Sequence, residues 1–280
     1  MKFSVLPVIM KKKPGDDVLS KMESHVGTFI RGAPRTAVIL GSGLGGFART
    51  LNGSVSIPYG EIPFYPKSSV EGHSGELVAG NIGDRAVLVA SGRFHMYEGY
   101  DVDTVTLPIR LFHRLGITDL IITNASGSVR KEVPPGSLMA LKGHIDCTFR
   151  ESADLPGINE DSRYHSPRLL KLAGAVAKRE GVQLRTGVYA WTLGPSFETP
   201  AEVVLVRKLG GDAVGMSTVP EIRAAGDLGL EVLGISCLTN YAAGITSKPL
   251  THEEVMEVTN DVSETFTRLM RGIVSEIGDS

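Results

Sequence analysis

The sequence has little of several features that would place it in a specialised class of protein. Only two of its 280 residues are cysteines, Cys147 and Cys237. Their spacing does not fit a metal site, and so small a number suits a reducing compartment. The apolar stretch FSVLPVIM at residues 3–10 is too short for a membrane helix, and its lysines follow it, whereas those of a secretory signal precede it. A net charge of −2 gives no electrostatic reason to bind nucleic acid or an anionic membrane. We therefore expect a cytoplasmic globular protein whose residues 1–15 are a docked or frayed end.

Apolar runs of strand length recur along the chain. They are rich in valine and isoleucine and do not alternate with polar residues, as is typical of strands buried on both faces. The runs lie at residues 36–40, 86–90, 119–123, 186–193, 212–216 and 231–236. A further strand is expected before the second run, joined to it by a turn at residues 81–84.

Segments with helical patterns lie between these runs. Residues 166–181 begin with Ser-Pro and end with glycine, and both TPAE at 199–202 and THEE at 251–254 fit a capping box. Helices are also expected at residues 18–30 and, kinked at Pro108, at residues 103–116. This alternation predicts an α/β fold: one domain over residues 1–280, with a central mixed, partly parallel β-sheet flanked by helices.

The glycine-rich stretch VILGSGLGGFA includes the end of the first predicted strand. Gly41, Gly43 and Gly46 match the G-x-G-x-x-G pattern of dinucleotide-binding turns, but Ser42 within the turn could hold a phosphate directly. The acidic residue expected about 20 positions later would be Glu61, which lies in a proline-flanked stretch with no clear helix before it. A coenzyme site therefore remains the weaker alternative.

A second polar segment, SGRFHMYEG, follows the 86–90 run. Alternation along an extended chain places Arg93 and His95 on one face and Phe94 on the other. The planar guanidinium of arginine matches a phosphate, and histidine adds another donor. Together with Ser42, Ser217 and the backbone amides of NASGS, these side chains could surround an oxyanion, although a surface arginine and a core histidine are the alternative.

Other polar residues at strand ends are open to two interpretations. His73 could donate to the same anion or be structural, and His252 could bind a ligand or serve only as a helix-start residue. Glu198 beside Phe197 could offer a base a carboxylate and a ring contact, or it could assist the helix cap. Asn240 could both donate to and accept from a ligand, or occupy a turn.

Seven motifs in one order carry a family resemblance. They are GSGLGG, GHSGEL, GRFHMYEGY, TNASGS, GPSFET, GDAVGMSTVPE and TNYAAGIT followed by HEEV. Over residues 37–255 the chain resembles the trimeric purine nucleoside phosphorylases. That resemblance implies a single mixed α/β domain, a homotrimer, and no metal or organic cofactor, with inorganic phosphate as co-substrate.

The resemblance also implies a role for each matching residue. It places phosphate against Ser42, Arg93, His95, Ser217 and the amide of Ala125, with His73 over the mouth of the site; ribose against Tyr97, Met216 and His252; and the base against Phe197, Glu198, Val214, Thr239 and Asn240. His95, Glu198 and Asn240 would be the catalytic residues.

The implied reaction is phosphorolysis of inosine, guanosine and their deoxy forms to free base and (deoxy)ribose 1-phosphate, in purine salvage. Asn240 and Glu198 favour a 6-oxopurine. The alternatives are a methylthioadenosine phosphorylase or xanthosine-accepting relative, a nicotinamide-dependent oxidoreductase based on the glycine loop, and a non-catalytic nucleoside-binding module. The implied partners are a purine nucleoside and orthophosphate, not nucleic acid or a membrane.

The chain departs from the family pattern in two places. The segment at residues 145–166 is shorter, although in relatives it carries an aromatic residue that reaches a neighbouring subunit's ribose site. Tyr164 is the first candidate to replace that aromatic residue, and Phe149 is the second. Ser126 and Ser128 stand where small residues are usual.

Overall fold

The computed structural model describes residues 15–66, 74–246 and 252–277, with side chains in the last range from residue 256. The strands are β1 (Thr36–Leu40), β2 (Asn52–Pro58), β3 (Glu76–Ile82), β4 (Arg85–Ser91), β5 (Asp119–Ser128), β6 (Ser137–Asp146), β7 (Leu184–Trp191), β8 (Ala213–Gly215) and β9 (Glu231–Tyr241). The helices are α1 (Asp16–Gly27), α2 (Val102–Val105), α3 (Leu107–Arg114), α4 (Pro167–Arg179), α5 (Pro200–Lys208), α6 (Val219–Asp227) and α7 (His252–Glu276). Short 3₁₀ helices are η1 (Gly45–Thr50), η2 (Tyr59–Glu61) and η3 (Met96–Glu98).

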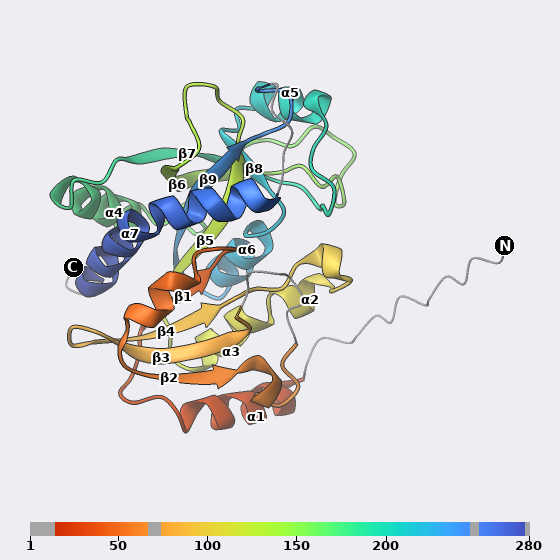
Figure 1. Cartoon of the computed structure of the whole chain (residues 1–280). Helices are drawn as coiled ribbons and strands as arrows, with labels where there is room; N and C mark the ends of the chain where they lie inside the picture. Colours follow the sequence, from red (N-terminus) through yellow and green to blue (C-terminus); the bar gives the residue numbers. More distant parts are fainter. Residues whose placement is uncertain (1–14, 67–73, 247–251, 278–280) are drawn as a thin grey trace.

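The strands form one mixed sheet in the order β2-β3-β4-β1-β5-β8-β7-β6-β9 (Figure 1). Strand β5 pairs with both β8 and β9, so that β5, β8, β7, β6 and β9 close into a ring of paired strands. Strands β2, β3, β4 and β1 extend the sheet from β5. Because β1 runs parallel to β4 and β5, and β5 runs parallel to β9, these four strands end at one edge of the sheet. The expected mixed α/β sheet is confirmed.

Helices cover both faces of the sheet because β1 and its neighbours are apolar on both sides. Ala37 and Ile39 of β1 belong to a core shared with α1, α3 and α6, whereas Val38 and Leu40 belong to a second core with α4 and α7. Figure 1 shows α7 lying across the sheet. None of the described helices is long and apolar enough to span a bilayer.

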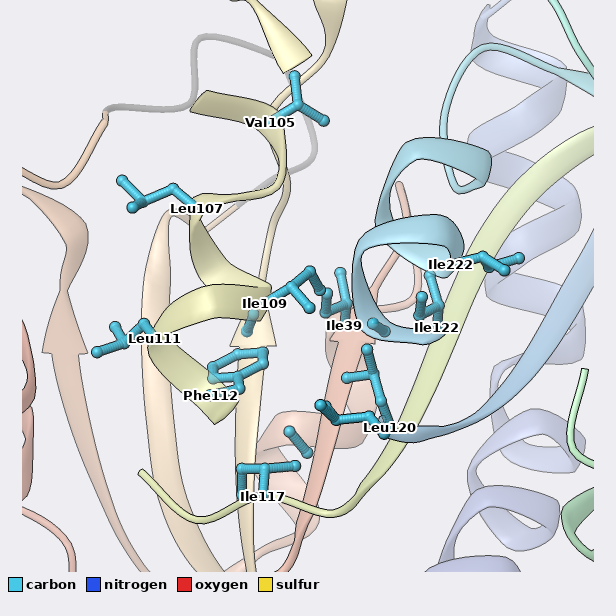
Figure 2. Packing of buried hydrophobic residues seen from close by; sticks show 14 of the residues in the cluster. Ile39, Val105, Leu107, Ile109, Leu111, Phe112, Ile117, Leu120, Ile122 and Ile222 are labelled. Carbon is cyan, nitrogen blue, oxygen red and sulfur yellow. The ribbon is translucent and has the colours of Figure 1, made fainter. Parts of the chain in front are cut away.

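Packing against the sheet holds α3 in place. With eight residues, α3 is too short to be stable alone in water. Ile109 and Phe112 face Ile39, Leu120 and Ile122 of the sheet (Figure 2). Each such apolar side chain contributes about 1.5–3 kcal/mol when it is buried, so α3 depends on this packing for its stability.

Several predicted elements are confirmed and others are wrong. All six apolar runs coincide with strands, and the β3–β4 hairpin turns at the expected residues. The single kinked helix at 103–116 is instead two helices, α2 and α3, that meet at Thr106. Pro108 does not kink a helix, because it lies in the first turn of α3, where its missing N–H costs nothing.

Strands β2 and β6 and helix α6 were not expected. Strand β2 is a mostly exposed edge strand with few apolar residues. In β6 the register shifts between Leu141 and Gly143, which interrupts its pattern. The Thr251 capping box lies outside the described residues, as does most of the expected N-terminal end at 1–15.

Candidate active site

A cavity of about 240 Å³ opens where β1, β4, β5, β8 and β9 bring their loops together. The predicted site residues that line it are Ser42, Arg93, His95, Tyr97, Ala125, Phe197, Glu198, Val214, Met216, Ser217, Thr239 and Asn240. His73 lies outside the described residues, and of His252 only its place at the start of α7 is described. Residues spread over about 200 positions of sequence therefore share one cavity.

Close packing requires glycine in the loop after β1. A Cβ on Gly41 would stand 2.6 Å from the Cα of Asn124 in β5, so only glycine lets this loop approach the neighbouring strand. Gly43 has φ of +75°, and a Cβ there would clash with Thr259 of α7. These two glycines hold Ser42 at the cavity beside β5.

The same loop lacks the helix of a dinucleotide-binding fold. A Rossmann turn leads directly into an α-helix whose N-terminus faces the pyrophosphate. Here the loop leads into η1, a 3₁₀ helix of six residues. The coenzyme alternative therefore loses its structural support.

Arg93 is buried beside the cavity and contacts three side chains of the described residues. Its Nη1 donates to the Ser217 hydroxyl at 2.8 Å and to the Thr218 hydroxyl at 3.0 Å. Its Nε lies 3.5 Å from Oε1 of Glu221, which is also buried, so the buried cation faces an anion. The arrangement presents a fixed positive charge and hydroxyl groups to the cavity.

Sequence reasoning missed Thr218 and Glu221, although a signal for them exists. TVPE at 218–221 fits the same capping-box pattern that identified α5, and at the start of α6 the Glu221 carboxylate accepts a hydrogen bond from the Thr218 backbone N–H at 2.8 Å. The pattern therefore predicts a helix that begins at this segment.

His95 is oriented by two neighbours. Its ring stacks on Tyr97, with centroids 4.6 Å apart and an interplanar angle of 21°. Oε1 of Glu98 accepts hydrogen bonds from the His95 backbone N–H at 2.8 Å and from Nδ1 at 3.1 Å. Glu98 is a third residue that sequence reasoning missed, although it lies three positions after the histidine. Phe94 points to the opposite side, into the core, as the alternation predicts.

Glu198 and Asn240 also line the cavity. Oε1 of Glu198 accepts a hydrogen bond from the Thr192 hydroxyl at 2.6 Å, and the ring of the adjacent Phe197 is 46% exposed. Oδ1 of Asn240 accepts from Thr239 at 3.0 Å, and Nδ2 donates to the Tyr241 carbonyl at 3.1 Å. A carboxylate and an amide therefore face one slot beside an aromatic ring.

A β-bulge brings Thr239 and Asn240 to the cavity. Ser126 of β5 pairs with Leu238 of β9, but Gly127 pairs with Asn240, so that Thr239 is the extra residue. Bulges of this kind redirect side chains and are common beside active sites.

Tyr97 and Met216 line the cavity as well. Both pack against Gly194, where a Cβ would stand 3.2 Å from the Tyr97 ring and would clash with the Met216 sulfur. Burial raises the pKa of Tyr97 to about 12, so its hydroxyl stays protonated at neutral pH. In residues 15–66, 74–246 and 252–277, no cluster of three or more His, Cys, Asp or Glu side chains could hold a metal ion.

The first candidate for the inter-subunit aromatic residue is wrong. Tyr164 packs within its own chain, 8% exposed, edge-on to His144, with its hydroxyl donating to Asp227 at 3.0 Å. Phe149, the second candidate, is 44% exposed and lines a neighbouring cavity that shares Phe197 with the first. The packing of Tyr164 against His144 and its hydrogen bond to Asp227 could not be read from its local sequence.

Comparisons with known proteins identify the family of this chain. Residues 35–275 match the family model described as the phosphorylase superfamily. Purine nucleoside phosphorylase 1 of Geobacillus stearothermophilus is 47% identical over 251 residues, 86% of this chain and 91% of that protein. Its namesake in Bacillus subtilis is 45% identical over 87% of this chain and 93% of its own length. A crystal structure of Schistosoma mansoni purine nucleoside phosphorylase with inosine has a TM-score of 0.85 and 34% identity, covering 95% of this chain and 98% of its own.

The chain therefore belongs to the phosphorylase superfamily and, within it, to the purine nucleoside phosphorylases, which are pentosyltransferases.

Proposed function

We propose that the chain cleaves inosine, guanosine and their deoxy forms with phosphate, releasing the free purine and (deoxy)ribose 1-phosphate in purine salvage. One observation carries the proposal: Arg93 and Ser217 share a cavity with Glu198 and Asn240, so an oxyanion site and a purine-shaped slot adjoin. Binding of both substrates in one cavity is what a group transfer between them requires.

Orthophosphate is proposed to bind at the arginine end. Ser42, Arg93, His95, Ser217 and the amide of Ala125 supply the donors, and His73 is proposed to cover the mouth. These groups orient the phosphate towards C1′ of the sugar. A phosphate that is bound in line with the departing base attacks C1′ faster because it is already correctly placed, so it need not become a stronger nucleophile.

The sugar is proposed to lie between the two ends, against Tyr97 and Met216, with His252 near its 5′ hydroxyl. The C1′–N9 bond breaks through an oxocarbenium-like state, and a C1′–O bond to phosphate forms. The electron pair of the broken bond moves onto the purine, which takes a proton from water.

The base end is proposed to stabilise that negative charge. Asn240 faces N7 and O6, Glu198 accepts from N1–H, and Phe197, Val214 and Thr239 line the slot. Contacts that strengthen as charge moves onto the purine stabilise the transition state and accelerate the reaction. Contacts that are equally strong in the bound substrate and in the transition state would only tighten substrate binding. The pair also sets the proposed preference for 6-oxopurines, because the N1 of adenine carries no proton.

The proposed function also includes an oligomeric state and a cellular compartment for this chain. Family membership supports a homotrimer in the cytoplasm that acts on small molecules, not on nucleic acid or at a membrane. The continuous sheet supports one domain over residues 1–280. Inorganic phosphate is the co-substrate, and neither a metal nor an organic cofactor takes part in the proposed reaction.

A substrate panel with and without phosphate tests the proposal. Inosine, guanosine, xanthosine, adenosine and methylthioadenosine are each incubated with the protein, and the free base is followed. We expect base release from inosine and guanosine only when phosphate is present. Release without phosphate would make the protein a hydrolase, and binding of inosine without release would make it a nucleoside-binding module.

A further inference from the structure

Thr218 has an unusual backbone conformation directly after Ser217. Its φ of +79° and ψ of −47° lie where β-branched residues are rarely found, and the Val219 N–H donates to the Ser217 carbonyl at 2.9 Å. This hydrogen bond closes a γ-turn centred on Thr218, which is fully buried. Strained turns persist only where their surroundings hold them, and they cluster at functional sites.

The hydrogen bonds of the Thr218 hydroxyl have defined directions. Arg93 Nη1 lies 3.0 Å and Asn124 Nδ2 lies 2.9 Å from Oγ1 of Thr218, and both nitrogens can only donate. The Asn124 amide is itself oriented, because its Oδ1 accepts from the Ser236 hydroxyl at 2.8 Å. Oγ1 of Thr218 therefore accepts two hydrogen bonds, and its own proton is directed to Oγ of Ser217 at 3.2 Å.

Counting donors and lone pairs in the same way defines the direction of the Ser217 hydroxyl. Its oxygen accepts from Arg93 Nη1 at 2.8 Å and from Thr218, which fills both lone pairs. Its proton is then available to a group in the cavity, which Ser217 lines. Four side chains in a row, Ser236, Asn124, Thr218 and Ser217, thus donate in one direction, towards the oxyanion end.

Glu221 holds this arrangement from the side of α6. One carboxylate oxygen accepts from the Thr218 backbone N–H at 2.8 Å, and the other lies 3.5 Å from Arg93 Nε. One buried anion therefore supports both the strained turn and the cation beside it.

We propose that Thr218 is a positioning residue for the co-substrate: through its hydroxyl it orients Ser217 as an obligate hydrogen-bond donor and holds Arg93 at the oxyanion. The inference rests on the proposed phosphate site. A site made of donors binds an oxyanion through the anion's acceptor oxygens, so sulfate, which carries no proton at neutral pH, is a suitable probe of binding without reaction.

Thr218→Val tests the inference because it keeps the size and β-branching of the side chain and removes only the hydroxyl. We expect the KM for phosphate and the inhibition constant for sulfate to rise about tenfold, the scale of one lost hydrogen bond to a charged group, with little change in the KM for inosine. Thr218→Ser keeps the hydroxyl and should restore both values. Thr218→Ala, which is less crowded at positive φ, gives the same comparison if the valine variant does not fold.

A double-mutant cycle separates positioning from general damage. Ser217→Ala alone should weaken phosphate binding, and adding Thr218→Val should then cost less than it does in the wild type, because Thr218 acts partly through Ser217. Thr106→Val is the matched control: its buried hydroxyl donates to the Val102 carbonyl at the α2–α3 junction, and its loss should leave the phosphate KM unchanged.

The outcomes distinguish this inference from the proposed function. If the wild-type protein shows no phosphate-dependent base release, the proposed function fails. If it does, and Thr218→Val and Thr218→Ala both keep the phosphate KM and sulfate inhibition within about twofold of wild type, only the role of Thr218 is overturned. Additive losses in the cycle would also overturn it.

Discussion

Gly127 and Asn240 face each other across the β5–β9 pair, and a Cβ on Gly127 would stand 3.2 Å from Nδ2 of Asn240. It would also lie 3.4 Å from the Cα of Ala242. Because Gly127 of β5 has no side chain, the Asn240 amide of β9 can occupy its observed position. This relationship makes the base end of the cavity sensitive to a single methyl group.

Gly127→Ala should therefore impair nucleoside use more than phosphate binding. The methyl group displaces the Asn240 amide by a few tenths of an ångström or more, and we expect kcat/KM for inosine to fall about tenfold or more. Steady-state kinetics in both substrates measure this. Gly174→Ala is the control, because a Cβ at that helical position meets nothing within 4 Å and should leave the kinetics unchanged. An unaltered kcat/KM for inosine in Gly127→Ala would show that the amide is not held where we place it.

Asn240→Asp should shift the preference between bases. A carboxylate accepts hydrogen bonds from the 6-amino group of adenine but cannot donate to the O6 of hypoxanthine. We expect the ratio of kcat/KM for adenosine over inosine to rise at least tenfold, with the phosphate KM unchanged. A ratio that stays constant would contradict the assignment of Asn240 to the 6-position.

Phe149 and Tyr164 should respond differently to substitution. Phe149→Ala removes an exposed ring from the cavity that adjoins Phe197 and Glu198, so we expect a raised KM for inosine and an unaltered KM for phosphate. Tyr164→Phe removes only a hydrogen bond to Asp227, so it should cost about 1 kcal/mol of stability and leave the kinetics unchanged. Kinetics and denaturant midpoints of the two variants distinguish these roles. If only Tyr164→Phe raised the KM for inosine, Tyr164 and not Phe149 would be the residue that contributes to nucleoside binding.

A buried histidine pair should make the fold sensitive to mild acid. His165 donates from Nδ1 to the Leu141 carbonyl at 3.0 Å, so its Nε2 accepts from Nδ1 of His144 at 2.9 Å. Burial lowers the pKa of His144 from 6.5 to about 3 and that of His165 to about 4. Because the unfolded chain binds protons from about pH 6.5 downward and the folded chain does not, this stability is complete above pH 6.5 and declines as the pH falls towards 4.

At about pH 5 each histidine should reduce the free energy of unfolding by about 2 kcal/mol relative to neutral pH. Urea midpoints at neutral and acid pH measure the loss. His144→Asn should reduce this dependence by about half, whereas His113→Asn, at an exposed position in α3, should leave it unchanged. Equal pH dependence in all three proteins would exclude the pair as its source.

The sequence by itself determined the fold class and most of the cavity lining. Buried parallel strands produce apolar runs that are visible locally, and the loops that follow them meet at one edge of a sheet for geometric reasons. Ser42, Arg93, Ser217 and Asn240 can therefore be assigned to one site from the sequence, with the family motifs supplying the roles.

Only the tertiary structure decided what holds those residues in place. Arg93 meets Thr218 and Glu221 across more than 120 positions of sequence, and no local period encodes such a pairing. Tyr164 was misjudged for the same reason, since its burial depends on His144 and Asp227, which approach it from other elements. Hydrophobic patterning specifies which face of a strand or helix is buried, whereas hydrogen bonds between distant segments exist only after those faces have packed.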